Sequence, residues 1–166
     1  MQSEISDPLN VAPFRSSVMT VRPEWLDYNG HMNMAYYGVL FDEAADEIYT
    51  GLGFGPEYQK TGFTTYTAEF HICYLRELHQ GDPVIVTLQL LDFDEKRFHI
   101  YQEIHHADGW CAATGESMGL HIDQSGPRVA PMPTDILARV RALHKAHGHL
   151  PWPERAGRSI GIKRKQ

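Results

Sequence analysis

The sequence predicts an α+β fold in which one antiparallel sheet wraps around a single long helix, with a short helix near the C-terminus. Between Met34 and Leu52, apolar residues recur three and four positions apart, which is the period of one helix face. Between Phe63 and Asp123 the period changes to two, and short turns separate four runs rich in β-branched and aromatic residues. A long helix followed by four closely connected strands predicts a meander packed on that helix.

Capping and turn residues predict the bounds of the elements. Asn33 is suited to cap the long helix, and Gly51 with Gly53 is suited to end it. Thr134 is expected to cap the second helix. The expected strands are residues 14–21, 63–78, 84–93, 97–106 and 110–123, and the expected helices are residues 34–52 and 134–146.

Composition indicates a soluble protein of one domain. The chain is 42% hydrophobic and 22% charged, and its formal net charge of −6 disfavours a nucleic-acid partner. The first residues lack the basic and apolar runs of a signal peptide, and no stretch is long enough to span a membrane, so a cytoplasmic location is expected. The expected organisation is an N-terminal arm (1–13), the folded domain (14–147) and a basic C-terminal extension (148–166).

Neither a disulfide framework nor a metal site is expected. Cys73 and Cys111 are too few for the first, and each is interpreted as a small core residue. His144 and His147 lie three apart, but no further ligand completes a metal set. Since the sequence also has no glycine-rich phosphate loop, no cofactor is expected.

The segment from Trp25 to Asn33 is the strongest candidate for a catalytic site. It enters the N-terminus of the long helix, where unpaired backbone N–H groups and the positive end of the helix dipole can stabilise an oxyanion. Asp27 supplies a carboxylate that can attack a carbonyl or activate water, and Gly30 permits a tight turn. These residue types in this order favour acyl transfer.

The string D-Y-N-G-H-M-N, followed by an aromatic-rich helix, resembles the D-x-x-G-H-x-N signature of hotdog-fold acyl-CoA thioesterases related to 4-hydroxybenzoyl-CoA thioesterase. The later string H-I-C-Y-L-R-E-L-H-Q-G-D-P-V is similar to a strand and Gly-Asp turn of that family, and the resemblance covers residues 14–123. It implies Asp27 as nucleophile or general base and the backbone N–H of Met34 as the group that polarises the thioester carbonyl. It also implies Asn33 as the helix cap and Gly30 as the motif glycine.

Within this family, R-P-E-W-L-D-Y-N-G-H-M-N-M-A-Y-Y and A-G-R-S-I-G-I-K-R-K are similar to betainyl-CoA thioesterases of carnitine breakdown. That resemblance implies a quaternary ammonium group held on aromatic faces near a carboxylate. The candidate substrate-binding residues are Trp25, Tyr28, His31, Tyr36, Tyr37, Tyr66, Glu69 and Trp110. The candidates for binding the CoA phosphates are Arg76, Lys96, Arg97 and Arg158.

Two other functions fit the same sequence. A hotdog hydratase or dehydratase acting on acyl-CoA or acyl carrier protein would depend on His31, which is otherwise expected to pack in the loop. A non-catalytic acyl-CoA-binding protein would need no reactive carboxylate. Because the sheet has free edges, a homodimer or homotetramer is expected in each case.

Overall fold

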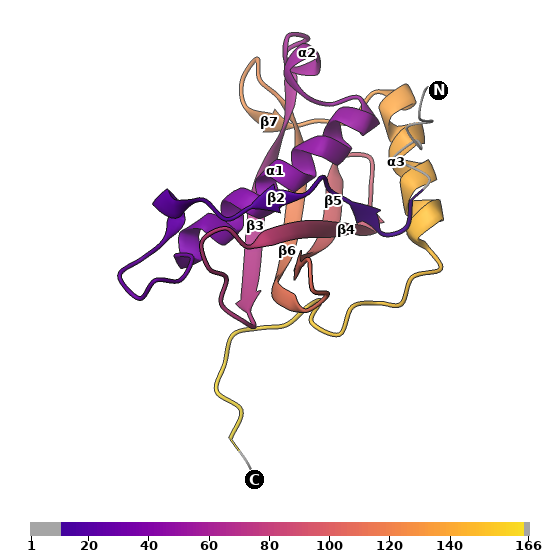
Figure 1. Ribbon diagram of the computed structural model, residues 1–166. Coiled ribbons are helices and arrows are strands. Elements are labelled where there is room, and N and C mark those ends of the chain that lie inside the picture. Colours follow the sequence, from indigo (N-terminus) through magenta and orange to yellow (C-terminus); the bar gives the residue numbers. More distant parts are fainter. Residues whose placement is uncertain (1–10, 165–166) are drawn as a thin grey trace, which may run out of the picture.

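A computed structural model of the chain describes residues 11–164 and shows one antiparallel sheet curled around one long helix (Figure 1). The strand order is β1-β4-β5-β6-β3, with β2 also paired to β4 and β7 to β6. The predicted architecture is therefore confirmed. The elements are β1 (Phe14–Arg15), β2 (Met19–Thr20), η2 (Pro23–Trp25), α1 (Met34–Leu52), α2 (Pro56–Gln59), β3 (Phe63–Tyr74), β4 (Pro83–Phe93), β5 (Arg97–His106), β6 (Cys111–Asp123), β7 (Arg128–Val129) and α3 (Thr134–His147).

Helix α1 has the predicted bounds because both of its ends are capped as expected. The Asn33 side chain accepts a hydrogen bond of 2.9 Å from the Ala35 N–H. At the other end Gly53 adopts a left-handed conformation with φ 99°, which a side chain would strain. Gly51 lies within the last turn of the helix, so Gly53 alone provides the stop.

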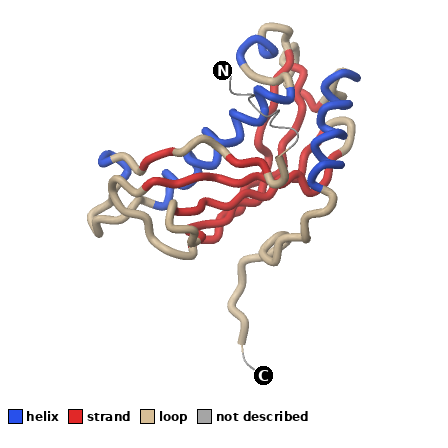
Figure 2. Tube along the Cα trace, turned by 45° about the vertical axis from the view of Figure 1, so that its right-hand side comes forward, coloured by secondary structure: helices blue, strands red, loops and turns tan. Residues whose placement is uncertain are grey.

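The face of the sheet that α1 covers is called the inner face, and the opposite one the outer face (Figure 2). Small residues on the inner face of β6 make room for the helix. A Cβ atom added at Gly115 would lie 2.9 Å from the Phe70 ring and 3.1 Å from the Phe41 ring. Aromatic rings from α1 and β3 thus pack directly over the β6 backbone, as close packing of the interior requires.

Several predicted bounds are corrected. The expected first strand is two short strands, β1 and β2, followed by η2. Strand β3 ends at Tyr74, because residues 75–82 leave the sheet as a loop. Thr134 is the first residue of α3 and makes no side-chain cap, since Pro133 occupies the capping position. The short elements α2 and β7 were not predicted.

The C-terminal extension is partly ordered against the sheet. Residues 148–158, called the outer-face tail, lie across the outer face, where the Pro151 carbonyl accepts a hydrogen bond from Gln89 of β4. Cys73 and Cys111 are free thiols, half-buried rather than in the core as predicted, and burial raises the pKa of Cys111 to about 11. The predicted N-terminal arm lies almost wholly outside the described residues. No helix in the described part of the chain is long and apolar enough to cross a membrane.

Candidate active site

The loop from Trp25 to Asn33, called the motif loop, is a tight turn closed by its own backbone. The Asp27 N–H donates to the His31 carbonyl at 2.9 Å, and the Gly30 N–H donates to the Asp27 carbonyl at 3.0 Å. Gly30 has φ 77°, which explains a glycine at that position. The Met32 N–H donates to the carbonyl of Leu78 at 2.8 Å, so the loop after β3 holds the motif loop in place.

Asp27 lies at the start of this turn and is half-buried. One oxygen of its carboxylate, Oδ1, accepts a hydrogen bond of 2.8 Å from the N–H of Asn29, which orients the group within its own turn. The chain then runs through the rest of the motif loop to Asn33, the residue that caps α1. The Asn33 N–H donates to the Trp25 carbonyl at 2.8 Å, which brings the two ends of the motif loop together at the N-terminus of α1.

The first turn of α1 leaves one backbone donor for a ligand. Asn33 satisfies two N–H groups, since its Oδ1 accepts from Ala35 at 2.9 Å and its carbonyl accepts from Tyr36 at 3.0 Å. Within residues 11–164 the N–H of Met34 has no hydrogen-bond acceptor. The capping residue therefore leaves the Met34 N–H available, and that group can donate to an oxyanion.

Aromatic side chains surround this helix end. Trp25 and Tyr36 are stacked with ring centroids 5.7 Å apart, and Tyr37 meets Tyr74 edge to face at 5.0 Å. The Tyr74 hydroxyl donates to the carbonyl of Met34 at 3.0 Å. Burial raises the pKa of the Tyr37 hydroxyl, and the charge of nearby Asp27 adds to this shift. Tyr74 was missed as a site residue, although the period of its strand could have placed it on the inner face.

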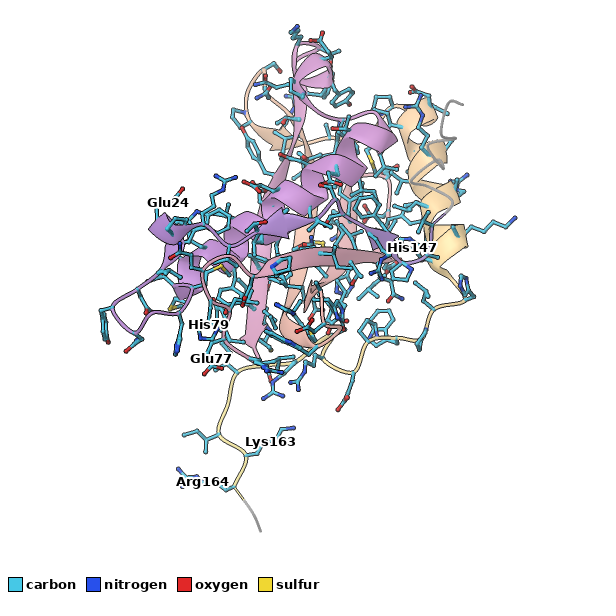
Figure 3. All side chains as sticks on the ribbon, viewed as in Figure 1. Glu24, Glu77, His79, His147, Lys163 and Arg164 are labelled. Carbon is cyan, nitrogen blue, oxygen red and sulfur yellow. The ribbon has the colours of Figure 1, made fainter. Side chains whose placement is uncertain are left out.

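The loop between β3 and β4 brings further titratable groups to the motif loop. The rings of His31 and His79 pack edge to face at 5.1 Å. A hydrogen bond to its own backbone and the proximity of His31 lower the pKa of Glu77, which is exposed and keeps its negative charge (Figure 3). Sequence reasoning also missed Glu77 and His79, because only the fold brings their loop beside residue 31.

A cavity of about 400 Å³ lies between α1 and the inner face. It starts in the first turn of the helix at Ala35 and follows the helix past Gly38 and Asp42. Asp27 does not line this cavity. The other residues that line it come from α1, β3, β5 and β6, and are Val39, Phe41, Ala45, Tyr49, Thr67, Phe70, Ile100, Gln102 and Ser117.

The remaining substrate-binding candidates are spread over several elements. Tyr28 belongs to the loop but is 98% exposed. Tyr66 of β3 lies opposite Leu120 of β6. Glu69 lines a separate cavity of about 290 Å³ together with Arg158 of the outer-face tail. Trp110 stacks on His106 and carries the guanidinium of Arg76 over its ring at 4.1 Å.

Lys96 and Arg97 lie at the opposite end of the sheet. They follow the 11-residue strand β4, which at the usual rise per residue separates its ends by about 33 Å. The side chain of Arg97 donates to Asp94 at 2.7 Å within its own turn. These two cations therefore do not flank Asp27 of the same chain.

Within residues 11–164, one group of potential metal ligands comes together. Glu103, His105 and Cys111 offer ligand atoms that all lie within 4.8 Å of one another. The contact of 2.8 Å between His105 and Glu103 lowers the pKa of Glu103, and the charge of nearby Arg155 lowers that pKa further. A cation beside the cluster and a paired carboxylate favour a structural ion-pair network, so no metal is assigned.

Comparison with known proteins assigns the family. Residues 21–140 match the model of the thioesterase-like superfamily. The betainyl-CoA thioesterase of Pseudomonas aeruginosa is 41% identical over 144 residues, which cover 86% of this chain and 91% of that protein. An L-carnitine dehydrogenase/betainyl-CoA thioesterase of Rhizobium meliloti is 38% identical over 92% of this chain, which spans only 31% of that longer protein.

Solved structures agree with this assignment. A hypothetical protein of Staphylococcus aureus in complex with CoA has a TM-score of 0.85 at 30% identity, covering 92% of this chain and 98% of the other. A putative thioesterase of Pseudomonas putida has a TM-score of 0.80 at 30% identity, covering 93% and 99%. The prediction of a hotdog-fold acyl-CoA thioesterase is confirmed, and the chain belongs to the thioesterase-like superfamily.

Proposed function

We propose that the chain hydrolyses betainyl-CoA to betaine and CoA, with Asp27 as nucleophile or general base. The observation that carries the catalytic part of this proposal is the N–H of Met34, which has no acceptor within residues 11–164 and lies at the N-terminus of α1, just after the loop that holds Asp27. The 41% identity to a betainyl-CoA thioesterase supports the choice of acyl group.

In the proposed reaction the thioester oxygen accepts a hydrogen bond from the Met34 N–H, and the positive end of α1 stabilises the negative charge that develops on it. As a nucleophile, the Asp27 carboxylate forms a bond to the carbonyl carbon and expels the CoA thiolate. Water then hydrolyses the resulting anhydride. As a general base, Asp27 instead takes a proton from the water that attacks the carbonyl. Neither route needs a cofactor.

The acyl group restricts where its charge can bind. In a betainyl group the trimethylammonium nitrogen is only two bonds from the carbonyl carbon, so its binding site must lie near the first turns of α1. Tyr74, which is 46% exposed and hydrogen-bonded to Met34, offers an aromatic face there. Glu77 adds a negative charge from the adjoining loop. Glu69 and Tyr66 serve this role less well, because they lie further along β3, about 17 Å and about 26 Å from Tyr74 at the usual rise per residue.

We also propose a homodimer formed through β3. This strand is an edge of the sheet, and its large side chains Tyr66, Phe70 and Tyr74 are 47%, 41% and 46% exposed. An apolar sheet edge of this kind is typical of an interface. Because Thr67 and Phe70 also line the 400 Å³ cavity, a second copy against β3 would close the cavity from solvent.

The test compares hydrolysis of betainyl-CoA and 3,3-dimethylbutanoyl-CoA, its uncharged isostere, with acetyl-CoA as a further substrate. We expect kcat/KM for betainyl-CoA to exceed that for the isostere about 5- to 30-fold, since a cation on an aromatic face contributes about 1–2 kcal/mol when partly desolvated. Equal rates on the charged and uncharged substrates would contradict the assignment of the acyl group. The rate of free-thiol release measures each reaction.

Asp27→Asn tests the catalytic assignment separately. The variant should lower kcat on the best substrate by about 100-fold or more, with little change in binding, because it removes the reactive carboxylate. Near-normal turnover would contradict the role of Asp27. His31→Ala should retain most activity, whereas a dehydratase that depends on His31 would lose nearly all of it.

A further inference from the structure

The C-terminal segment 159–164, called the arm, leaves the body of the molecule with two large apolar side chains in solvent. Ile160 is 91% exposed and Ile162 is 85% exposed. They alternate with Ser159, Gly161 and the basic Lys163, as expected for an extended segment with one apolar side. Figure 3 shows Lys163 and Arg164 on this segment, well away from the folded body. Two large apolar side chains on one side of a short segment favour contact with another surface.

The preceding outer-face tail fixes the direction in which the arm leaves. Its contacts follow the strand order across the sheet: Pro151 meets β4 through Gln89, and Trp152 packs on His99 of β5 with ring centroids 5.9 Å apart. The N–H of Gly157 then donates to both carboxylate oxygens of Glu116 on β6, at 3.0 and 2.8 Å.

The last contact of the tail is with the edge of the sheet. Arg158 lines the 290 Å³ cavity together with Glu69 and His71 of β3. Since β3 is the final strand in the order β1-β4-β5-β6-β3, a chain that crosses β4, β5, β6 and β3 in turn next passes the free edge. Figure 1 shows the yellow C-terminal segment leaving the body after it has crossed the strands.

We infer that the arm crosses the β3 edge and docks on the outer face of a second copy of this chain, so that two copies exchange arms. This inference rests on the β3-edge dimer proposed above. In a two-fold dimer the two β3 strands are neighbours, and each arm therefore continues over the partner's sheet. The outward-facing Tyr66, opposite Leu120, offers apolar surface to the isoleucines there.

The charge of the arm favours a second copy of this chain as its binding partner. The arm carries Lys163 and Arg164 and no acidic residue, whereas the whole chain has a formal net charge of −6. Glu69 adds an exposed carboxylate on the β3 edge. A basic arm is therefore attracted to the acidic body of another copy, whereas two acidic bodies repel each other.

The test measures dimer dissociation by analytical ultracentrifugation over a dilution series. Truncation after Arg158, and Ile160→Ser with Ile162→Ser, should each raise the dimer Kd about 10- to 100-fold, since both remove apolar contacts on both sides of the interface. Ile160→Val with Ile162→Val, which keeps the apolar contacts, is the matched control and should stay within about threefold of the wild type. Circular dichroism and thermal unfolding of each variant check that the body remains folded.

A second measurement identifies the surface on which the arm docks. The S159C substitution, made in a C73S/C111S background, introduces a single thiol that carries a spin label and keeps both isoleucines, and this protein is mixed with unlabelled ¹⁵N protein. Broadening of amide signals on β3 of the ¹⁵N copy would support docking on the partner. A dimer whose Kd is unchanged by truncation, or an arm that broadens no signals in the mixed sample, would overturn the arm exchange alone. A protein that stays monomeric would overturn the proposed β3 dimer as well.

Discussion

Two carboxylates, one on the outer face of the sheet and one in the motif loop, have different surroundings. Glu116, on the outer face, lies 2.7 Å from His99 Nε2 and accepts two hydrogen bonds from Gly157. Asp27, in the motif loop, accepts a hydrogen bond from Asn29 within its own turn. Glu116 thus connects β5 and β6 to the C-terminal tail, whereas Asp27 orders only its own turn within the described part of the chain.

The difference separates a structural carboxylate from a candidate for chemistry. A carboxylate whose lone pairs are taken by a histidine and a backbone N–H contributes to stability and is poorly placed to react. Asp27, which within residues 11–164 is hydrogen-bonded only within its own turn, costs the fold little to expose to a substrate. We therefore place the candidate site at the motif loop and the N-terminus of α1, whereas the C-terminal tail lies on the outer face.

The comparison is tested most strongly by removing the charge at each position. Asp27→Asn should lower kcat about 100-fold or more, whereas Glu116→Gln should keep kcat within about threefold. Glu116→Gln should instead lower the free energy of unfolding by about 1–2 kcal/mol, because it weakens a charged hydrogen bond to the tail. Steady-state thiol release and urea unfolding measure the two effects. The same loss of kcat in both variants would remove the distinction.

The packing on the inner face is tested by Gly115→Ala. The added Cβ would lie 2.9 Å from the Phe70 ring, so the variant should lose about 1–3 kcal/mol of unfolding free energy. It should also lose activity, because Phe70 lines the 400 Å³ cavity. Gly126→Ala, which has no atom within 4 Å of the added Cβ, is the matched control. Equal stability of the two variants would show that the inner face can relax.

A buried histidine tests how hydrogen bonding and burial affect a basic group, and this prediction has the smallest expected effect. His147 Nδ1 accepts a hydrogen bond of 2.9 Å from the Leu90 N–H, and burial lowers the pKa of its imidazole. The unfolded state then binds more protons than the folded state, so stability is complete above about pH 6.5 and falls as the pH drops below it.

His147→Asn should therefore weaken the dependence of stability on pH. The difference between urea midpoints at about pH 7.5 and about pH 5.5 should be smaller in this variant than in the wild type. His149→Asn, at an exposed position two residues further along the chain, should leave that difference nearly unchanged. An unaltered difference in His147→Asn would contradict the role of the buried ring.

Local signals predicted the elements whose bounds depend on local chemistry. Helix α1 was predicted from its apolar period and from Asn33, and its N-terminal bound holds because that side chain caps the Ala35 N–H. Strand β3 was predicted too long, since Leu75 and Leu78 continue its apolar character. Leu78 lies in a loop but is buried, and its carbonyl accepts a hydrogen bond from the Met32 N–H. Such a contact between segments distant in the sequence leaves no local pattern.

The sequence by itself determined the family, the long helix and the contiguous motif loop, because a turn and a helix cap depend on residues close together in the chain. Only the tertiary structure decided that Tyr74 and Glu77 join this loop and that Glu69 and Arg158 meet on the outer face. It also placed Lys96 and Arg97, which follow β4, at the far end of the sheet. Those relations depend on strand order and register, which form only when segments tens of residues apart pair and pack.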